Sequence, residues 1–269
     1  MSAPATRSPH PTPDPGTTRP RSVVLRGPDV VDPFADGPTA AFLDLLVDAL
    51  DGEVDATRGT RARFSTDAGN YRVPPLAVVF PAHTQDVVEA LGLCRAHGVP
   101  LTTRGGGTSC AGNAIGPGIV LDFSRHLNHV LSVDADARTA VVEPGCVEAT
   151  LQRAAAPHGL RFGPDPSSQN RATIGGMVGN NACGPHATAW GRTADNIVAL
   201  ECVDGRGRRF TARTTHDADI PEVPGLVDLI DANLALIRTE LGTFGRQVSG
   251  YSLEHATPEG HRNLAADRK

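Results

Sequence analysis

Apolar side chains recur at helical spacing in four stretches of the chain, and the first begins near Thr39. One face of that helix carries Phe42, Leu45, Leu46, Ala49 and Leu50, with Gly52 placed to end it. The same spacing predicts helices from Thr84 to just before Gly98, over 147–158 and over 225–241. In the second of these, Thr84 is the expected N-cap.

Short apolar runs between turn residues predict strands. They cover residues 76–80, 99–103, 118–123, 129–133, 139–143, 197–203 and 208–212, and the last two form a hairpin. Residues 53–75 have neither pattern and are predicted to be irregular. Short strands mixed irregularly with helices favour an α+β fold over a doubly wound parallel sheet.

Composition divides the chain into four parts. Residues 1–38 are predicted to be a disordered Pro-rich tail, because their first 22 residues carry almost no apolar side chains. Residues 39–75 form an N-terminal helix and an irregular lead-in, 76–213 the main domain, and 214–269 a helical segment.

Charge and apolar content exclude two classes of partner. The net charge is −5 and the single lysine is Lys269, so nothing points to a nucleic acid. No apolar run reaches the roughly 18–20 residues of a membrane span. We expect a cytoplasmic chain that reaches the inner face of a membrane, if at all, as a peripheral protein through a partner.

The cysteines and histidines suggest no metal cluster. Five scattered cysteines without a Cys-x-x-Cys pair are typical of reduced, buried thiols. His126 and His129 have a spacing that would suit a metal on a helix. Without a third clustered ligand, we interpret them as solvated or capping histidines.

The sharpest motif follows the predicted strand 99–103 and reads Arg104-Gly-Gly-Gly-Thr-Ser-Cys-Ala-Gly112-Asn113. Consecutive glycines let backbone N–H groups converge on an anion, and Thr108 and Ser109 add hydroxyl donors. A Rossmann fingerprint would need glycine where Cys110 stands, and a P-loop would need Gly-Lys-Ser/Thr. The alternative is that the three glycines only turn a tight corner.

A second glycine-rich stretch spans residues 163–184. It contains Gly163-Pro-Asp-Pro-Ser-Ser168 and Thr173-Ile-Gly-Gly-Met-Val-Gly-Asn-Asn-Ala-Cys-Gly184, and it is predicted to be neither helix nor strand. Alone, a mobile loop would explain it. Two such loops about sixty residues apart are better explained by one long ligand that touches both.

An ordered series of motifs carries a family resemblance. Pro81-Ala-His-Thr-Gln-Asp-Val, the Arg104 loop, Val142-Glu-Pro-Gly145, Gly163-Pro-Asp-Pro-Ser and Thr173-Ile-Gly-Gly resemble the FAD-binding (PCMH-type) domain of the p-cresol methylhydroxylase/vanillyl-alcohol oxidase superfamily. The branch is similar to the D component of glycolate oxidase and to D-lactate dehydrogenase, and also to long bacterial proteins with a C-terminal iron–sulfur region. The resemblance implies two α+β subdomains with FAD between them.

The resemblance also implies which residues hold FAD. Those expected along the pyrophosphate are Arg104, Gly105, Gly106, Gly107, Thr108, Ser109, Gly112 and Asn113. Pro144 and Gly145 would approach the adenosine half. Those expected along the ribityl chain and the isoalloxazine are Pro166, Ser167, Thr173, Gly175, Gly176, Asn180 and Gly184. Arg104 has an alternative role, bracing the loop through an ion pair.

Two departures from the family pattern matter. Some branches bind the flavin covalently through a histidine where this sequence has Thr108, so we expect non-covalent FAD. The family continues with a Gly-Ser/Thr-Glu-Gly-Thr motif and a substrate-binding cap domain, which this sequence lacks. We therefore expect the catalytic base to lie outside it, and catalytic residues stay unassigned.

The implied reaction is oxidation of a small D-2-hydroxy acid (lactate, glycolate or 2-hydroxyglutarate class) by hydride transfer to the flavin N5. Electrons would pass to an iron–sulfur domain, a quinone or another acceptor. One alternative is a truncated, non-catalytic FAD-binding module that needs a cap and an iron–sulfur partner. Another is an NADPH-dependent reductase of the same fold, which lacks the Pro-Asp-Pro-Ser and Thr-Ile-Gly-Gly combination.

Overall fold

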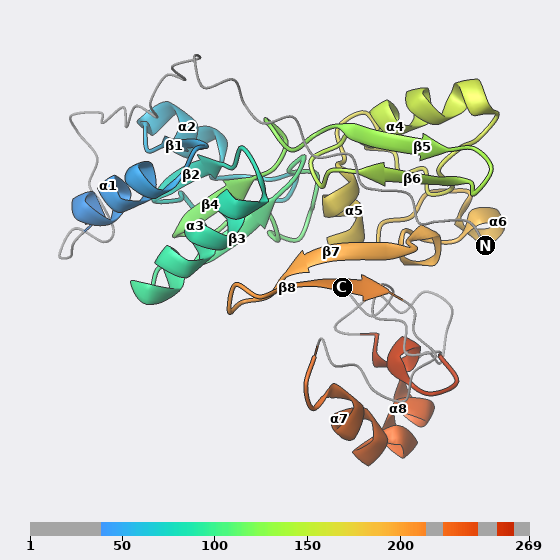
Figure 1. Ribbon diagram of the computed structural model, residues 1–269. Coiled ribbons are helices and arrows are strands. Elements are labelled where there is room, and N and C mark those ends of the chain that lie inside the picture. Colours follow the sequence, from blue (N-terminus) through green and yellow to red (C-terminus); the bar gives the residue numbers. More distant parts are fainter. Residues whose placement is uncertain (1–38, 214–222, 242–251, 261–269) are drawn as a thin grey trace, which may run out of the picture.

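The computed structural model describes residues 39–213, 223–241 and 252–260 (Figure 1). The predicted tail, residues 1–38, lies outside these ranges. In chain order the elements are α1 (Thr39–Ala49), β1 (Glu53–Asp55), α2 (Arg58–Arg63), β2 (Ala77–Phe80), α3 (Thr84–Ala96), β3 (Leu101–Arg104), β4 (Ile119–Asp122), β5 (Val130–Asp134), β6 (Thr139–Val142), α4 (Glu148–Ala155), η1 (Ala156–His158), α5 (Ile174–Asn180), α6 (Ala187–Trp190), η2 (Ala194–Asn196), β7 (Ala199–Val203), β8 (Arg209–Arg213), α7 (Leu226–Ala232), α8 (Leu234–Glu240) and η3 (Leu253–Ala256).

The first unit is a four-stranded sheet of order β1-β2-β4-β3, in which β2, β4 and β3 run parallel and β1 antiparallel. Side chains of β2 alternate between two buried faces. Val79 packs with α1 and α3 in the larger core, and Phe80 packs with Phe64 beside α2 on the other face. Burial on both faces explains why β2 is a continuous apolar run.

The second unit consists of two antiparallel hairpins with helices beside them. The β5–β6 hairpin is covered by α4 and α5, whose Leu151, Ile174 and Met177 form a small core. The β7–β8 hairpin follows and packs against the start of α7. A four-stranded sheet and two separate hairpins, with helices distributed irregularly among them, confirm the α+β prediction.

Several predicted elements differ in detail. The stretch predicted to be irregular, 53–75, contains β1 and α2, because the Thr57 side chain caps α2 and β1 pairs with β2. α1 buries Leu43 where the spacing indicated Leu45, which is exposed. The N-cap of α3 is His83, one residue before the predicted Thr84.

The predicted helix over 225–241 is two helices that meet at Asn233. Ile230 of α7 and Ile237 of α8 pack on Ala256 of η3, and Leu229 is exposed. Residues 163–184, predicted to lack regular structure, contain α5, because Thr173 caps it and Asn181 ends it in the left-handed conformation. Among the described residues, no helix is long and apolar enough to cross a membrane.

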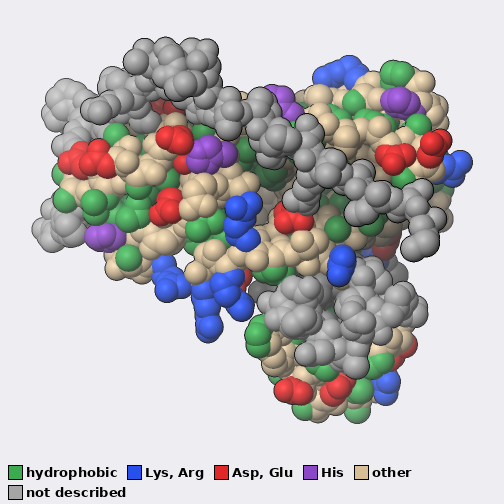
Figure 2. Space-filling view, viewed as in Figure 1, with side chains coloured by type: hydrophobic (Ala, Val, Ile, Leu, Met, Phe, Trp, Pro, Cys, Tyr) green, Lys and Arg blue, Asp and Glu red, His purple; other side chains and the backbone are tan. Residues whose placement is uncertain are grey.

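Figure 2 shows basic side chains gathered near the end of α3 and the turn of the β7–β8 hairpin. Arg95 lies in the last turn of α3, and Arg206, Arg208 and Arg209 are exposed at the hairpin. The turn approaches α3, since a Cβ on Gly207 would be 3.7 Å from Val88. This contact joins the second unit to the first.

Candidate functional site

The first glycine loop begins where β3 ends and packs directly on the second unit. A Cβ atom on Gly105 would overlap the Oγ1 of Thr173, and one on Gly106 would overlap the carbonyl oxygen of Arg171. Both positions therefore require glycine for the approach of the two chains. The structure thus brings together two loops about sixty residues apart in the sequence.

The backbone of this loop offers donors. No hydrogen bond among the described residues uses the backbone N–H groups of residues 105–110, six in succession. Gly107 has a φ of +64°, the left-handed conformation that turns neighbouring N–H groups toward a common point. Buried or ligand-facing N–H groups need acceptors, so this run is suited to an anion with several oxygens.

Arg104 supports the first glycine loop. Its Nη1 donates to the carbonyl oxygens of Thr66 at 2.9 Å and Ala114 at 3.1 Å, and its guanidinium lies 4.9 Å from the centroid of the Phe64 ring. Burial lowers the pKa of Arg104, while the charges of Asp122 and Asp67 oppose that effect. Arg104 therefore braces the loop through carbonyl groups, and among the described residues it makes no ion pair of the kind proposed as its alternative role.

The rest of the first loop is held by its own side chains. Ser109 Oγ donates to Asn113 Oδ1 at 3.0 Å and accepts from the N–H of Ala111 at 3.3 Å. Gly112, with a φ of +79°, lies against the ring of Tyr71. Thr108 has no hydrogen bond to another described residue, so its hydroxyl is available to a ligand.

The Thr173 segment is bonded internally. Thr173, which is almost fully buried, accepts the N–H of Gly176 at 3.3 Å, and the Nδ2 of Asn180 donates to the Gly176 carbonyl at 3.2 Å. The N–H of Gly175 donates to the Pro144 carbonyl at 2.8 Å. Pro144 and Gly175 therefore contact each other directly, although the prediction assigned them to different parts of FAD.

Gly145 ties the same region to the first unit. Its N–H donates to the carbonyl of Leu127 at 2.7 Å, and a Cβ there would overlap the carbonyl oxygen of Phe123. Gly145 is buried, whereas Pro144 beside it is exposed. Of this pair, only Pro144 presents a surface to a ligand.

The Pro-Asp-Pro segment contacts the end of the second loop. His186 Nδ1 donates to Asp165 Oδ2, and a Cβ on Gly184 would overlap the carbonyl oxygen of Asp165. The hydrogen bond from His186 is the main reason that the pKa of Asp165 lies below its ordinary value. Pro166 and Ser167 follow Asp165 directly and are partly or fully exposed.

Sequence reasoning missed the residues that support these loops. Thr66 and Phe64 hold Arg104, and Asp165 holds His186. Asp165 lies inside a motif that we used, so its buried carboxylate could have been suspected beside the two prolines. Nothing local indicates that Phe64 and Thr66 reach Arg104.

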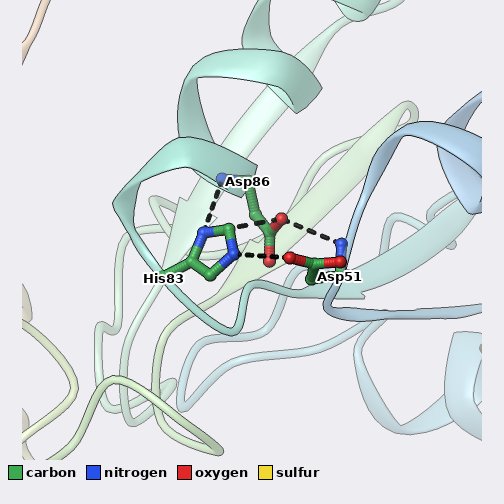
Figure 3. Close-up of side chains that lie close together, drawn as sticks. All are labelled: Asp51, His83 and Asp86. Atoms are coloured by element: carbon green, nitrogen blue, oxygen red, sulfur yellow. Dashed lines mark hydrogen bonds and ion pairs between the residues drawn. The ribbon is translucent and has the colours of Figure 1, made fainter. Parts of the chain in front are cut away.

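Two clusters of polar side chains outside the glycine loops have structural explanations. In Figure 3, Asp86 accepts the N–H of Asp51 at 3.0 Å, and His83 links Asp86 to Asp51. Asp86 also accepts the N–H of Ala82 at 2.7 Å. These three side chains are close enough to share a metal ion. Their hydrogen bonds, however, serve the start of α3, where Asp86 and His83 cap the helix.

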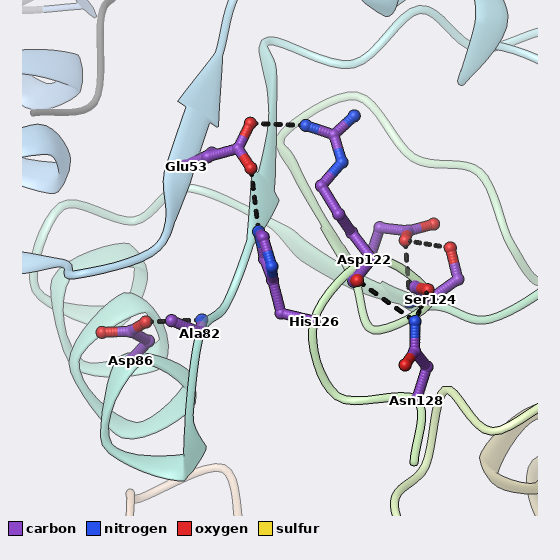
Figure 4. Close-up of polar contacts among 8 residues, drawn as sticks. Glu53, Ala82, Asp86, Asp122, Ser124, His126 and Asn128 are labelled. Carbon is purple, nitrogen blue, oxygen red and sulfur yellow. Dashed lines mark hydrogen bonds and ion pairs between the residues drawn. The ribbon is translucent and has the colours of Figure 1, made fainter. Parts of the chain in front are cut away.

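The second group fixes the turn between the two units. In Figure 4, Glu53 bonds His126 at 2.8 Å, Asp122 accepts the N–H of Ser124 at 2.9 Å, and Asn128 donates to the Ser124 carbonyl at 2.8 Å. His129 instead bonds Glu143 at 2.7 Å. The two histidines that we compared with a metal pair thus serve different carboxylates.

All five cysteines are free thiols. Cys94 and Cys146 are buried, and burial raises the pKa of Cys94 to about 11. Cys110, in the first glycine loop, is exposed, so the expectation of buried thiols is wrong there.

The fold and the first loop together define a domain that presents backbone donors to an anionic ligand. Residues 75–213 match the family described as FAD binding domain. This match covers more than half of the chain, and the chain belongs to that family. FAD is its cofactor, and the resemblance drawn from the motifs is confirmed.

The chain is also similar in sequence to curated proteins. D-2-hydroxyglutarate dehydrogenase of Pseudomonas putida is 35% identical over 250 residues, which is 87% of this chain and 25% of that protein. Glycolate oxidase subunit GlcD of Bacillus subtilis is 35% identical over 57% of this chain and 33% of its own length. The chain therefore spans a quarter to a third of these curated relatives.

Among solved structures, 6-hydroxy-D-nicotine oxidase of Arthrobacter nicotinovorans superposes with a TM-score of 0.56 at 23% identity. The superposition covers 66% of this chain and 38% of that one. At this identity the likeness shows the fold alone.

The residues present fit the cofactor. A diphosphate needs several donors at close approach. Residues 105–110 offer N–H groups that have no partner among the described residues, and the three glycines carry no side chain. The Thr108 hydroxyl adds a further donor.

Proposed function

We propose that the chain binds FAD non-covalently, with the pyrophosphate on the N–H groups of residues 105–110. The observation that carries this is the run of six donors without described partners, beside a second loop that contacts the first. Hydrogen bonds to a charged oxygen contribute about 1.5–3 kcal/mol each, so a few suffice without a lysine. Thr108 and Ser109 would add hydroxyl groups.

The other proposed contacts with FAD involve residues outside 105–110. Gly112 and Asn113 would complete the pyrophosphate side, and Pro144 with Gly145 the adenosine side. The second loop would follow the ribityl chain and the isoalloxazine through Pro166, Ser167, Thr173, Gly175, Gly176, Asn180 and Gly184. Buried Thr173 and Gly145 would act by shaping the backbone, since little of either is exposed.

Arg104 would position the loop rather than bind phosphate. Its Nη1 already donates to two carbonyl groups, and its guanidinium contacts the Phe64 ring. Thr108 supports non-covalent binding, because a threonine cannot form the histidyl link found in some branches of the superfamily. The same loop would thus hold FAD through reversible contacts only.

For the whole protein we propose oxidation of a small D-2-hydroxy acid, with electrons passing on to an iron–sulfur domain, a quinone or another acceptor. Relatives named D-2-hydroxyglutarate dehydrogenase and glycolate oxidase subunit GlcD support this class. When bound, the flavin would accept a hydride at N5 from the substrate Cα, while the protein supplies position and electrostatics. The residues of this chain would hold the cofactor and exclude water from it.

A second candidate is a FAD-binding module that is active only with further protein regions. It is favoured by the share of the relatives that the chain spans, 25% of the Pseudomonas putida dehydrogenase. Turnover of D-2-hydroxyglutarate, D-lactate and glycolate with an artificial electron acceptor separates the two. Bleaching of the flavin by NADPH would instead favour a reductase.

The test of FAD binding is a visible spectrum before and after acid precipitation. We expect a flavin spectrum that moves entirely to the supernatant, because no covalent link holds the cofactor. Flavin that stays in the pellet would contradict non-covalent binding. A well-folded, colourless chain that takes up no added FAD would overturn the proposal itself.

A further inference from the structure

Residues 65–73, which precede β2, form a turn that lies against the first glycine loop. Its two arms are joined by an antiparallel bridge between Thr66 and Arg72, and the N–H of Val73 donates to the Ser65 carbonyl at 2.8 Å. The sequence pattern predicted no regular structure in this stretch. The 65–73 turn is nevertheless a defined element, although it belongs to no helix or named strand.

The tip of the turn contacts the backbone of the glycine loop. The N–H of Ala68 donates to the carbonyl oxygen of Ser109 at 3.0 Å. A Cβ on Gly69 would lie 2.6 Å from the carbonyl oxygen of Cys110, so this position requires glycine for the two backbones to approach. The turn therefore holds the carbonyl side of two successive residues of the loop.

Tyr71 extends the contact to Gly112, which has a φ of +79°. The Cδ2 atom of Tyr71 lies 3.3 Å from the position that a Gly112 Cβ would take. Although Tyr71 is 61% exposed, its ring thus packs on the backbone of a residue assigned to the pyrophosphate side. At the other end of the loop, Arg104 Nη1 donates to the Thr66 carbonyl, so the turn contacts both ends.

The hydrogen bond from Ala68 decides where the last donor of residues 105–110 points. The carbonyl of Ser109 and the N–H of Cys110 belong to one peptide unit, and the described residues contain no cis peptide bond. In a trans peptide the C=O and N–H groups point in opposite directions. Because the carbonyl is bonded to the turn, the N–H of Cys110 points away from the turn.

The first donor of residues 105–110 is oriented in the same way. The Arg104 carbonyl accepts the N–H of Phe123 at 3.1 Å, and the N–H of Gly105 shares its peptide unit. That N–H therefore points away from Phe123. Hydrogen bonds to carbonyl groups thus fix the first and the last of the six N–H groups within the protein itself.

Resting on the proposed function, we infer that the 65–73 turn is a positioning element for FAD, which aims the Cys110 N–H at the pyrophosphate and holds Gly112 in its left-handed conformation. The Ala68 N–H and the Tyr71 ring carry this effect, and neither needs to contact the cofactor. Residues 171–173 support the start of the loop, and the turn supports its end. Order that exists before binding lowers the conformational entropy lost when FAD binds.

The direct test is the NMR signal of the Cys110 amide. The chain has five cysteines, so isotope-labelled cysteine gives five backbone amide signals, and Cys110→Ser identifies the one that belongs to residue 110. Addition of FAD should move this signal downfield, because the N–H gains a charged acceptor. The signal of Cys94, buried in α3, should stay in place. A turn with a purely structural role would leave both signals unmoved.

Gly69→Ala tests the turn through the affinity for FAD. Its Cβ would meet the Cys110 backbone and displace the end of the loop. FAD affinity should fall by about 10-fold or more, the value of one hydrogen bond to a charged oxygen. At saturating FAD the Cys110 signal should also move less than in wild type. Gly205→Ala is the matched control, since Gly205 is an exposed turn glycine with no atom within 4 Å of an added Cβ.

Tyr71→Ala removes the ring from an exposed position, so the apoprotein should fold with little loss of stability. Its FAD affinity should fall by about two- to tenfold, because Gly112 must then be ordered during binding. Tyr71→Phe keeps the ring and should bind FAD like wild type. Titration of each apoprotein with FAD, beside urea unfolding, measures both quantities.

The possible failures have different meanings. If FAD binds without moving the Cys110 signal, or if Gly69→Ala binds FAD as tightly as Gly205→Ala, the positioning role is wrong and FAD binding stands. Equal losses in Tyr71→Phe and Tyr71→Ala would make the Tyr71 hydroxyl a ligand group and overturn the role of its ring. If wild type binds no FAD, the proposed function fails, and this inference fails with it.

Discussion

The two glycine-rich loops use glycine for different reasons. In residues 105–110 the N–H groups have no acceptor among the described residues, whereas in the Thr173 segment the N–H groups of Gly175 and Gly176 are both bonded within the protein. The first loop therefore has donors to offer, and the second has already used its own. Two loops of similar composition therefore differ in how many of their backbone donors are bonded within the described part of the protein.

The contact between them explains why the chain needs both. Gly105 and Gly106 allow the first loop to pack directly on residues 171–173, so the second segment supports the first loop. A loop whose six N–H donors have no partner in the described part of the chain would be costly to order on ligand binding if nothing supported it. Packing on a capped, internally bonded helix supplies that order beforehand.

The largest expected effect comes from removing the support under the first loop. Arg104→Met should lower the free energy of unfolding of the apoprotein by about 2–4 kcal/mol, because hydrogen bonds to charged groups and the ring contact are lost together. Urea unfolding measures this. Arg95→Met, at an exposed position in the last turn of α3, should change stability little. If Arg104→Met weakens FAD binding without destabilising the apoprotein, Arg104 is a phosphate ligand and not a brace.

A methyl group between the loops should separate them. Gly106→Ala places a Cβ against the backbone carbonyl of Arg171, which cannot rotate away. Overpacking costs about 1–3 kcal/mol, so FAD binding should weaken by about 10- to 100-fold. Titration of the apoprotein with FAD measures it. The control, Gly59→Ala on α2, meets no atom within 4 Å and should bind FAD normally; equal affinity of both variants would mean that loop contact is unimportant.

Removing one internal bond of the second loop should have a moderate effect. Thr173→Val keeps the shape but loses the acceptor for the Gly176 N–H, which should lower stability by about 1 kcal/mol. Thermal unfolding with and without FAD measures the change. Thr173→Ser retains the hydroxyl and should lose less. Equal losses in both variants would show that the methyl group, and not the cap, is what matters.

The smallest effect should discriminate most sharply between the loops. Thr108→Val removes a hydroxyl that has no described hydrogen bond, so the stability of the apoprotein should stay the same. FAD affinity should fall by about two- to tenfold, less than the full value of a hydrogen bond to a charged oxygen, because water can replace the lost hydroxyl at this partly exposed position. Calorimetric titration would show it. A fall in apoprotein stability with unchanged FAD affinity would mean that Thr108, too, belongs to the support.

Much of the candidate site could be predicted because its motifs are local. Gly105 to Gly107 follow a strand directly, and Thr173 precedes a helix that it caps, so residue type and neighbours carried the information. The helix itself was missed, since Gly175, Gly176 and Gly179 are poor helix formers. Packing of Ile174 and Met177 against the β5–β6 hairpin overrides that preference.

Contacts between distant segments could not be predicted in the same way. Phe64 and Thr66 reach Arg104 because α2 packs on the sheet, a consequence of how the whole first unit folds. The exposure of Cys110 and of Leu45 likewise depends on which neighbours cover them. No spacing in the sequence records those neighbours.

The sequence by itself determined the class of this protein: an α+β, FAD-binding domain with threonine at the position of a possible covalent link. It did so because glycine, proline and small polar residues in a fixed order constrain the backbone locally. Only the tertiary structure decided which N–H groups have partners among the described residues, and which glycines are needed for close packing. It also paired Asp165 with His186, since hydrogen-bond partners are chosen by proximity in space, which local sequence does not encode.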